Sequence, residues 1–600
     1  MLLVQVGGDE EEVEALAEPI ITAFEGENDG LEVSFGGPLA TGQAFGETIG
    51  EDLARAEAIA IPISLVLLLL VFGSVVAAFL PVLIAGVAIV GTFLALYLIT
   101  LATDVSVFSI NLATALGLGL AIDYSLFMVS RFREELATGS STEDAVARTM
   151  QTAGRTVAFS ALTVAVSLAA LLIFPLYFLR SFGYAGIAVV LIAGAAALFT
   201  LPALLSVLGP RVDKFRVGRA PRADRADRSG RFFGRLASTV MRRPIIIGAP
   251  IAILLAVLAV PFLGVSFGLP DDRSLPADST ARVVGETLRS DYPGGATSLA
   301  SVVLPRSTEE DAAAAAARIS ELPGVSQVDT ASGSYAGGEL AEPPGPQSAR
   351  YAAGDGIYLD VGSGVEPISP EGEALVRDIR DLELSSTALV GGDAAALVDS
   401  KSAIFGLAPF ALAIIALTTF VLLFLLTGSV LVPVKAIVLN VLSLGATFGA
   451  MVWIFQDGHL SDLLGFTPTG TLDTTTPILM FCIAFGLSMD YEVFLLSRIK
   501  EAHDLTGDTN LAVVTGLQRT GRIMTAAAAV LAVTFIAFST SGVAFIKLMG
   551  VGLTLAILLD ATIVRSLLVP AFMRLAGEAN WWAPAPLRRL HQRIGINESG

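Results

Sequence analysis

Eleven apolar runs constrain this chain more than any other feature. Each run has about 20 residues, which is the length a helix needs to cross about 30 Å of hydrocarbon. The bilayer core offers no water to the backbone, so each run must be helical. Charged residues make up only 16% of the chain, against roughly a quarter in soluble domains. The sequence therefore predicts an α-helical membrane protein with eleven spans, at about 58–78, 80–100, 105–130, 156–175, 182–208, 245–264, 402–426, 430–455, 474–497, 523–541 and 545–573.

Two Asp-Tyr dipeptides lie inside these apolar runs. Asp123-Tyr124 occurs in GLGLAIDYSLFMVSRFREEL, and Asp490-Tyr491 occurs in AFGLSMDYEVFLLSRIKEAH. A carboxylate near the centre of a membrane helix costs about 2.5–3.5 kcal/mol on insertion scales. Because the chain carries this cost twice, at matching places, we predict that both acids are functional.

The two halves of the chain form an internal repeat. VFGSVVAAFLPVLIAGVAIVGTF (71–93) aligns with LTGSVLVPVKAIVLNVLSLGATF (426–448), and Gly119 aligns with Gly486. Repeats of this size are common in secondary transporters, whose sites lie near the midplane between the repeats. Both halves point the same way under the positive-inside rule, so the sequence predicts two parallel repeats.

Charge is distributed unevenly along the chain and predicts its orientation. Residues 209–243 hold eleven Lys/Arg and three Asp, whereas residues 1–57 hold fourteen Asp/Glu and one Arg. Positively charged loops stay in the cytoplasm. We therefore expect a multi-pass protein of the cytoplasmic membrane with a cytoplasmic C-terminus and two acidic segments outside. Topology explains the basic loop, so nucleic acid is not an expected partner.

The acidic segments have the pattern of ferredoxin-like α+β domains. Residues 298–390 read as strand, helix, strand, strand, helix and strand, which is the order of that fold. Residues 1–37 match only its second part, with a strand at 2–6, a helix at 9–24 and a strand at 31–35. We therefore expect this chain to lack one upstream helix and the first part of the first outer domain.

The predicted organisation follows from these patterns. A truncated first outer segment is followed by five helices of the first repeat, a basic cytoplasmic linker, the first helix of the second repeat, a second outer domain, the remaining helices and a short cytoplasmic tail. The boundaries are, in this order, 1–57, 58–208, 209–244, 245–264, 265–401, 402–575 and 576–600.

The motifs resemble those of one known family. The segments AIDYSLFMVSRFREEL and SMDYEVFLLSRIKEAH, the Gly-Ser helix starts, and LLDATIVRSLLVPAFMRL near the end are similar to those of the MMPL transporters of the resistance-nodulation-division superfamily. The resemblance implies twelve helices, two periplasmic porter domains and proton-driven export of lipids or other hydrophobic molecules. It also implies that Asp123 faces Tyr491 and that Asp490 faces Tyr124.

The predicted site is a proton relay. A tyrosine hydroxyl can donate a hydrogen bond to a charged carboxylate and can rotate when the acid is neutral. Moving one elementary charge through the membrane potential is worth about 2.3 kcal/mol per 100 mV, enough to shift a helix bundle between two packings. Small residues let membrane helices approach closely, so we predict a packing role near the relay. The proposed packing residues are Gly117, Gly119 and Gly486.

Further charged residues lie in the last helices. Asp560 falls in LTLAILLDATIVRSLLVPA and has Ala193 as its repeat counterpart, so it is either a third relay carboxylate or the partner of a neighbouring helix. We expect Arg565 to extend its side chain to the inner surface. Glu492 is expected to face the cytoplasm in a structural role.

Other functions remain as alternatives. The chain could be a lipid- or sterol-sensing relative that does not pump, an inactive fragment of a transporter, or a protein-translocation auxiliary. A nucleophile elbow, a Walker loop and a metal-ligand cluster are missing from the sequence, so we expect no enzyme activity, no cofactor and no metal. The expected partners are membrane lipids, a hydrophobic lipid-like substrate and protons, and a homo-oligomer is compatible with the sequence.

Overall fold

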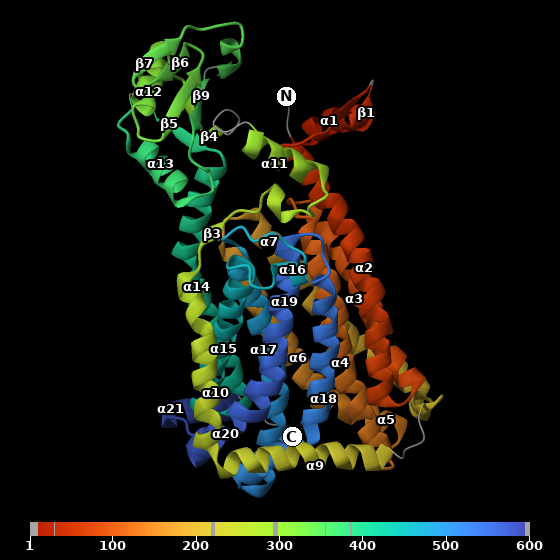
Figure 1. Cartoon of the computed structure of the whole chain (residues 1–600). Coiled ribbons are helices and arrows are strands. Elements are labelled where there is room, and N and C mark those ends of the chain that lie inside the picture. The colour runs from red at the N-terminus through yellow and green to blue at the C-terminus, as the bar shows by residue number, and fades with distance from the viewer. Residues whose placement is uncertain are drawn as a thin grey trace. The chain divides into compact units, whose positions relative to one another are not determined.

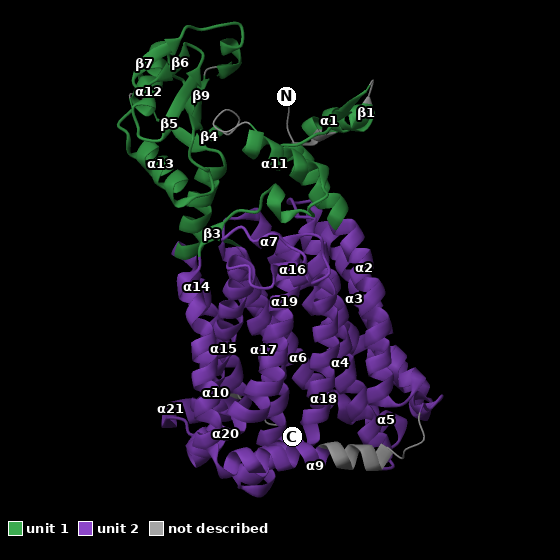
Figure 2. Cartoon of the chain, viewed as in Figure 1, with its two compact units in different colours: residues 1–48, 266–405, 471–474 green, residues 49–265, 406–470, 475–600 purple. Residues whose placement is uncertain are grey.

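The computed structural model describes residues 10–28, 30–217, 222–291, 298–353, 356–384 and 387–594. The chain divides into two compact units (Figure 2). Unit 1 contains residues 1–48, 266–405 and 471–474. Unit 2 contains residues 49–265, 406–470 and 475–600 and holds most of the long apolar helices.

Eleven helical segments within the described residues are long and apolar enough to cross a membrane, which confirms the predicted fold class. They are α2 (Pro38–Phe72), α3 (Val75–Thr100), α4 (Phe108–Ala137), α5 to η2 (Thr142–Ile173), α7 to η4 (Tyr177–Asp213), α10 with η5 (Pro244–Gly264), α14 (Asp393–Thr427), α15 with η8 (Leu431–Gln456), α17 (Thr476–Thr506), α18 (Thr509–Phe538) and α19 to η10 (Ala544–Trp581).

A Gly-Ser turn lies at matching places in the two repeats, between α2 and α3 in the first and between α14 and α15 in the second. The first predicted span, 58–78, ends earlier, at Phe72, because Gly73 adopts a φ of 63°. Ser74 then caps α3 by accepting a hydrogen bond from the Ala77 amide. In the second repeat, Gly428 has a φ of 70° and Ser429 accepts from the Val432 amide. Glycine permits the left-handed turn, and serine satisfies the start of the next helix.

Helices α4 and α17 lie at the centre of unit 2. The apolar part of α4 is entirely buried and that of α17 almost entirely so, whereas α10, α2 and α3 keep most of their apolar surface exposed. Figure 1 shows α10 at one side of the helix bundle and α2 with α3 at the other. The helices that carry the Asp-Tyr dipeptides are therefore surrounded by protein on all sides.

The two repeats exchange helices around this centre. Helix α6 (Arg155–Ala169) follows α4 in the first repeat but packs on α17, and α18 follows α17 in the second repeat and packs on α4. The packing of α6 on α17 brings a hydroxyl of the first repeat to the acid of the second.

Unit 1 contains the predicted ferredoxin-like fold. Its sheet has the strand order β10-β4-β9-β5, and each of these neighbours is antiparallel. Helices α12 and α13 pack on the sheet and share one apolar core with it. The elements are β4 (Ser298–Pro305), α12 (Glu309–Ser320), β5 (Val325–Thr330), β9 (Gly356–Ser363), α13 (Pro370–Asp381) and β10 (Leu389–Gly391), with a hairpin of β6 (Gly333–Ala336) and β7 (Glu339–Glu342) inserted after β5.

The described part of the N-terminal segment contains one helix and one short hairpin. Helix α1 (Glu10–Phe24) agrees with the predicted helix, and β2 (Leu31–Val33) lies within the predicted strand 31–35. This strand pairs with β1 (Gly26–Asn28) in a hairpin. The strand predicted at 2–6 lies outside the described residues.

A small-residue contact joins α10 and α15. Gly445 and Gly449 are four residues apart on α15, which is the spacing that lets membrane helices approach closely. A Cβ atom added at Gly449 would lie 1.9 Å from the carbonyl oxygen of Leu258, whereas one at Gly445 would lie 3.3 Å from the Cβ of Ala259.

We therefore expect Gly449→Ala to lower the free energy of unfolding by about 1–3 kcal/mol, because backbone must move to admit the methyl group. Gly445→Ala is the matched control on the same face, and its cost is expected to be smaller. Unfolding of both variants in lipid bicelles measures the difference. Equal losses of stability would show that this contact does not set the distance between the helices.

Candidate functional site

The two predicted acids are buried at the centre of unit 2. Asp123 on α4 and Asp490 on α17 are each 1% exposed. The Tyr491 hydroxyl donates a hydrogen bond to Oδ2 of Asp123. The Ser160 hydroxyl, on α6, donates to Oδ1 of Asp490. Each acid of one repeat is thus bonded to a hydroxyl of the other repeat.

The second Asp-Tyr pair differs from the first. No hydrogen bond joins Asp490 to Tyr124 among the residues that the structure describes, and the Tyr124 hydroxyl has no hydrogen-bond partner there. Ser160 provides the donor instead. Sequence reasoning missed Ser160, although its hydroxyl in the apolar run 156–175 was a usable signal.

Asp560 is paired within its own helix. It begins the π-helical segment Asp560–Leu568, which continues α19, and Arg565 donates a hydrogen bond to it. In a π-helix, residues i and i+5 are joined along the backbone, so the local winding brings these two side chains together. The prediction that Arg565 extends to the inner surface was wrong, because it is only 3% exposed.

Arg565 connects three parts of the site. Besides Asp560, its guanidinium donates to the Ser488 carbonyl of α17 at 2.7 Å. Its central carbon also lies 4.6 Å from the centre of the Tyr491 ring. A cation over an aromatic face is attracted by the ring. The positive charge of Arg565 therefore touches both the third acid and the tyrosine that bonds to Asp123.

A second buried ion pair lies on α15 and α17. Lys435 Nζ is 3.0 Å from Oε1 of Glu492, and both side chains are buried. Glu492 therefore does not face the cytoplasm as predicted, and its position beside a buried cation explains why it lies inside. Lys435 was also missed, although a lysine within a predicted span is itself a signal.

Both ion pairs of the site lie in the second repeat. The aligned positions of the first repeat carry neutral residues in place of the two ion pairs. Lys435 aligns with Leu80, and Glu492 aligns with Ser125. Asp560 aligns with Ala193, and Arg565 aligns with Leu198.

Each relay acid keeps one buried oxygen that has no hydrogen-bond partner in the described part of the chain. These oxygens are Oδ1 of Asp123 and Oδ2 of Asp490. A carboxylate can accept at both oxygens and, once protonated, can donate from one of them. Both acids therefore retain an atom that can take part in proton transfer.

The predicted packing glycines contact flanking helices. A Cβ at Gly117 would meet Ile89 of α3 and Val189 of α7, and one at Gly119 would lie 2.1 Å from Leu531 of α18. A Cβ at Gly486 would meet Val164 of α6. These glycines hold neighbouring helices against α4 and α17, and their contacts do not lie between α4 and α17.

Two aromatic rings join α4 and α17 one turn beyond the acids. Phe127 and Phe494 stack with ring centres 3.7 Å apart and planes at 4°. They occupy equivalent positions, four residues after Asp123 and Asp490. This apolar contact separates the buried acids from the helix ends beyond it.

The two tyrosines are expected to respond differently to loss of the hydroxyl. Tyr491→Phe removes a hydrogen bond to a carboxylate, which is worth about 1.5–3 kcal/mol, so it should lower the free energy of unfolding by that order. Tyr124→Phe should leave it unchanged or raise it. Unfolding of both variants in bicelles provides the measurement, and a greater loss for Tyr124→Phe would contradict the assigned bond.

Removal of Arg565 should be more harmful than removal of the whole ion pair. Arg565→Gln leaves the Asp560 charge buried without its cation, which costs about 3–5 kcal/mol of stability. The double variant Asp560→Asn with Arg565→Gln removes both charges, and we expect it to recover part of that loss. A double variant no more stable than Arg565→Gln would show that the two charges are not coupled.

The described residues contain no group of three or more His, Cys, Asp or Glu side chains that could hold a metal ion. The single cysteine, Cys482, is a buried thiol on α17. The candidate site consists of carboxylates, hydroxyls and the buried cations Lys435 and Arg565.

The sequence of this chain is similar to those of several known membrane proteins. Residues 1–247 and 274–595 match the MMPL family. A membrane protein of Streptomyces coelicolor is 45% identical over 95% of this chain and 76% of its own length. The trehalose monomycolate exporter MmpL3 of Mycobacterium tuberculosis is 38% identical over 95% of this chain. Membrane protein YdfJ of Bacillus subtilis is 30% identical over 90% of this chain. The chain spans 63% of the length of the mycobacterial exporter and 72% of that of YdfJ.

Proposed function

This chain belongs to the MMPL family of transporters, and we propose that it uses the proton motive force to export lipids or other hydrophobic molecules across the cytoplasmic membrane. It is a multi-pass membrane protein and not an enzyme. The observation that carries the proposal is the pair of buried carboxylates, each bonded to a hydroxyl of the opposite repeat.

Proton uptake at these acids would change the contact between the repeats. A charged Asp123 holds the Tyr491 hydroxyl strongly, because a hydrogen bond to a charged group is worth about 1.5–3 kcal/mol. Protonation of Asp123 removes the charge and weakens this bond. One proton moved through 100 mV supplies about 2.3 kcal/mol, which is of the same size. The proton gradient can therefore drive the repeats between two packings.

Asp560 is proposed to act as a third relay carboxylate through Arg565. The guanidinium bonds to Asp560 and also lies over the Tyr491 ring. A change of charge at Asp560 alters the field that Arg565 exerts on Tyr491, and hence on Asp123. The π-helical segment supports this role, since such segments are frequent at functional sites.

The proposed orientation places the arginine-rich helix ends and the C-terminus in the cytoplasm. Arg131 and Arg498 occupy equivalent positions near the ends of α4 and α17, as expected for parallel repeats. Under the positive-inside rule these ends are cytoplasmic. The ferredoxin-like domain of unit 1 would then be extracytoplasmic.

The proposed substrate class comes from the relatives. One relative is named a trehalose monomycolate exporter, and MmpL11 of Mycolicibacterium smegmatis, 34% identical over 94% of this chain and 58% of its own length, is named an exporter of mycolic acid-containing lipids. We propose a lipid with long apolar chains as the substrate of this chain.

Proton flux into proteoliposomes tests the proposal. With the full chain reconstituted and a pH gradient imposed, Asp123→Asn and Asp490→Asn should each abolish substrate-dependent proton flux, because an amide cannot carry the proton. Asp104→Asn changes an exposed acid and is the matched control. Wild-type flux in either relay variant would exclude the relay, and a wild-type chain that binds lipid without flux would support the sensor alternative.

A further inference from the structure

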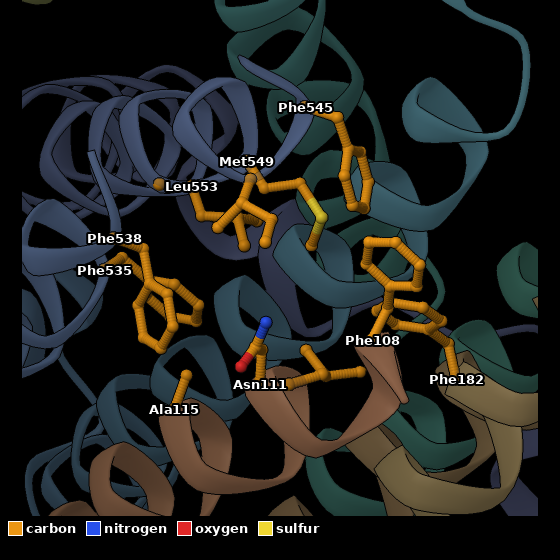
Figure 3. A pocket seen from close by; sticks show the side chains of 12 residues that line it. Phe108, Asn111, Ala115, Phe182, Phe535, Phe538, Phe545, Met549 and Leu553 are labelled. Carbon is orange, nitrogen blue, oxygen red and sulfur yellow. The ribbon is translucent and has the colours of Figure 1, made fainter. Parts of the chain in front are cut away.

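An apolar pocket inside unit 2 is too small to hold a ligand. It lies among α4, α7, α18 and α19, where aromatic side chains such as Phe108, Phe535 and Phe538 surround it (Figure 3). Its volume is about 30 Å³, which is room for about two water molecules. A larger molecule has to bind elsewhere, and the outer surface of the helix bundle offers a candidate.

A helix that lies across the bundle provides this surface. Helix α9 (Arg222–Arg242) packs on α18 and on the π-helical segment Asp560–Leu568, and Figure 1 shows it running across one end of the long helices. The contact with α18 is close, because a Cβ added at Gly521 would lie 2.5 Å from the Phe233 ring. Gly521 comes two residues before the apolar run 523–541. Helix α9 therefore crosses α18 where that helix meets the membrane surface.

The two sides of α9 differ in chemistry. Val240 and Met241 are buried against the bundle. Arg235 and Arg242 are exposed, and their spacing of seven residues puts them on the same side of the helix. Acidic residues are absent from positions 230–243 of the sequence. The exposed side of this part of α9 is therefore basic.

Three exposed arginines of this region carry charge that the described part of the protein does not balance. Arg235, Arg242 and Arg243 form no ion pair with a described residue. A guanidinium is planar and can bind a phosphate group through two parallel hydrogen bonds. A phosphate group is thus a partner of suitable charge and shape.

Exposed apolar residues place these arginines at the level of the lipid headgroups. Helix α10 follows α9 directly, and its Ile245 and Ile246 are 63% and 67% exposed, so they require hydrocarbon around them. Arg242 and Arg243 immediately precede them in the sequence. Phe232 of α9 is also 60% exposed. Arginines on one face with an aromatic residue beside them are typical of helices that lie in the plane of the membrane interface.

We propose that α9 binds the headgroups of anionic phospholipids in the leaflet that it touches, through Arg235, Arg242 and Arg243. Anionic lipids attract basic segments close to the membrane surface. The exposed apolar side chains beside the arginines favour a lipid surface over a nucleic acid. Under the proposed orientation this leaflet is the cytoplasmic one, and that clause rests on the proposed function, whereas lipid binding does not. Because α9 lies in the linker between the repeats, bound lipids would hold this linker at the membrane surface.

Quenching by spin-labelled lipids tests the proposal. A nitrobenzoxadiazole dye is attached to Thr239→Cys, on the exposed side of α9, in the full chain in phosphatidylcholine nanodiscs; Cys482 is buried and stays unlabelled. The quenchers are phosphatidylglycerol and phosphatidylcholine that carry a doxyl group on an acyl chain. We expect phosphatidylglycerol to quench at an about fivefold lower mole fraction, the contribution of one arginine beside one anionic headgroup. Quenching by neither lipid, or equal quenching by both, would overturn the proposal.

A charge-matched pair of variants localises the effect. Replacement of Arg235, Arg242 and Arg243 by Gln should make the two lipids quench equally. Helix α21 (Ala585–Ile594) supplies the control, because replacement of its exposed Arg588, Arg589 and Arg593 by Gln removes the same charge and should keep the preference. Equal loss of preference in both triple variants would show that net charge acts without a site on α9, and would overturn the proposal.

A charge-conserving variant separates lost charge from altered folding. Replacement of the three α9 arginines by Lys should keep the preference for phosphatidylglycerol, since an ammonium group also attracts phosphate. Loss of the preference in this variant would contradict the electrostatic basis of the proposal.

Soluble anions provide a further test of the partner. An excess of inorganic phosphate should lower the preference no more than sodium chloride of equal ionic strength, which acts only by screening. A larger effect of inorganic phosphate would assign the arginines to a soluble anion and overturn the lipid proposal.

Proton flux distinguishes this proposal from the proposed function. Asp123→Asn should keep the preference for phosphatidylglycerol, because the arginines do not depend on the relay. A preference in a chain without proton flux would support the lipid surface and exclude the exporter. Flux without a preference would exclude the lipid surface and leave the exporter.

Discussion

The cost of holding a carboxylate away from water governs the centre of this protein. Asp123 and Asp490 are tolerated there because hydroxyl groups donate to them, and in both cases the hydroxyl comes from the other repeat. The packing of α6 on α17 makes the Ser160 bond geometrically available, whereas the Tyr491 bond joins α17 to α4 directly. The same two hydrogen bonds therefore stabilise the buried acids and join the two repeats.

The repeats are alike in fold and unlike in charge. Both use the same Gly-Ser turn, the same stacked phenylalanine and the same acid, yet only the second carries the Lys435–Glu492 and Asp560–Arg565 pairs. If the acids take up protons as proposed, the unequal distribution of charge would make protonation act differently on the two repeats. The π-helical segment adds to this difference, because it places Arg565 beside Tyr491, which bonds to the first repeat's acid.

Some residues of the site could be selected from the sequence, and others could not. Charged residues in apolar runs were visible, so Asp123, Asp490 and Asp560 could be selected from the sequence. Ser160 was not selected, since a single hydroxyl in a membrane helix usually bonds to its own backbone. Arg565 was assigned to the inner surface because a long basic side chain can extend to the membrane interface. The π-helical segment that places it beside Asp560 was not visible in the sequence. The glycines were predicted to be packing positions, but which helix each one contacts depended on the tertiary structure.

The sequence by itself determined the eleven spans, the repeat and the ferredoxin-like order of strands and helices, because hydrophobic length and periodicity are local properties of the chain. The tertiary structure alone decided which hydroxyl meets which acid and that Glu492 and Arg565 are buried. These outcomes depend on distances between segments hundreds of residues apart. Such distances are set by the packing of whole helices, and no local pattern contains them.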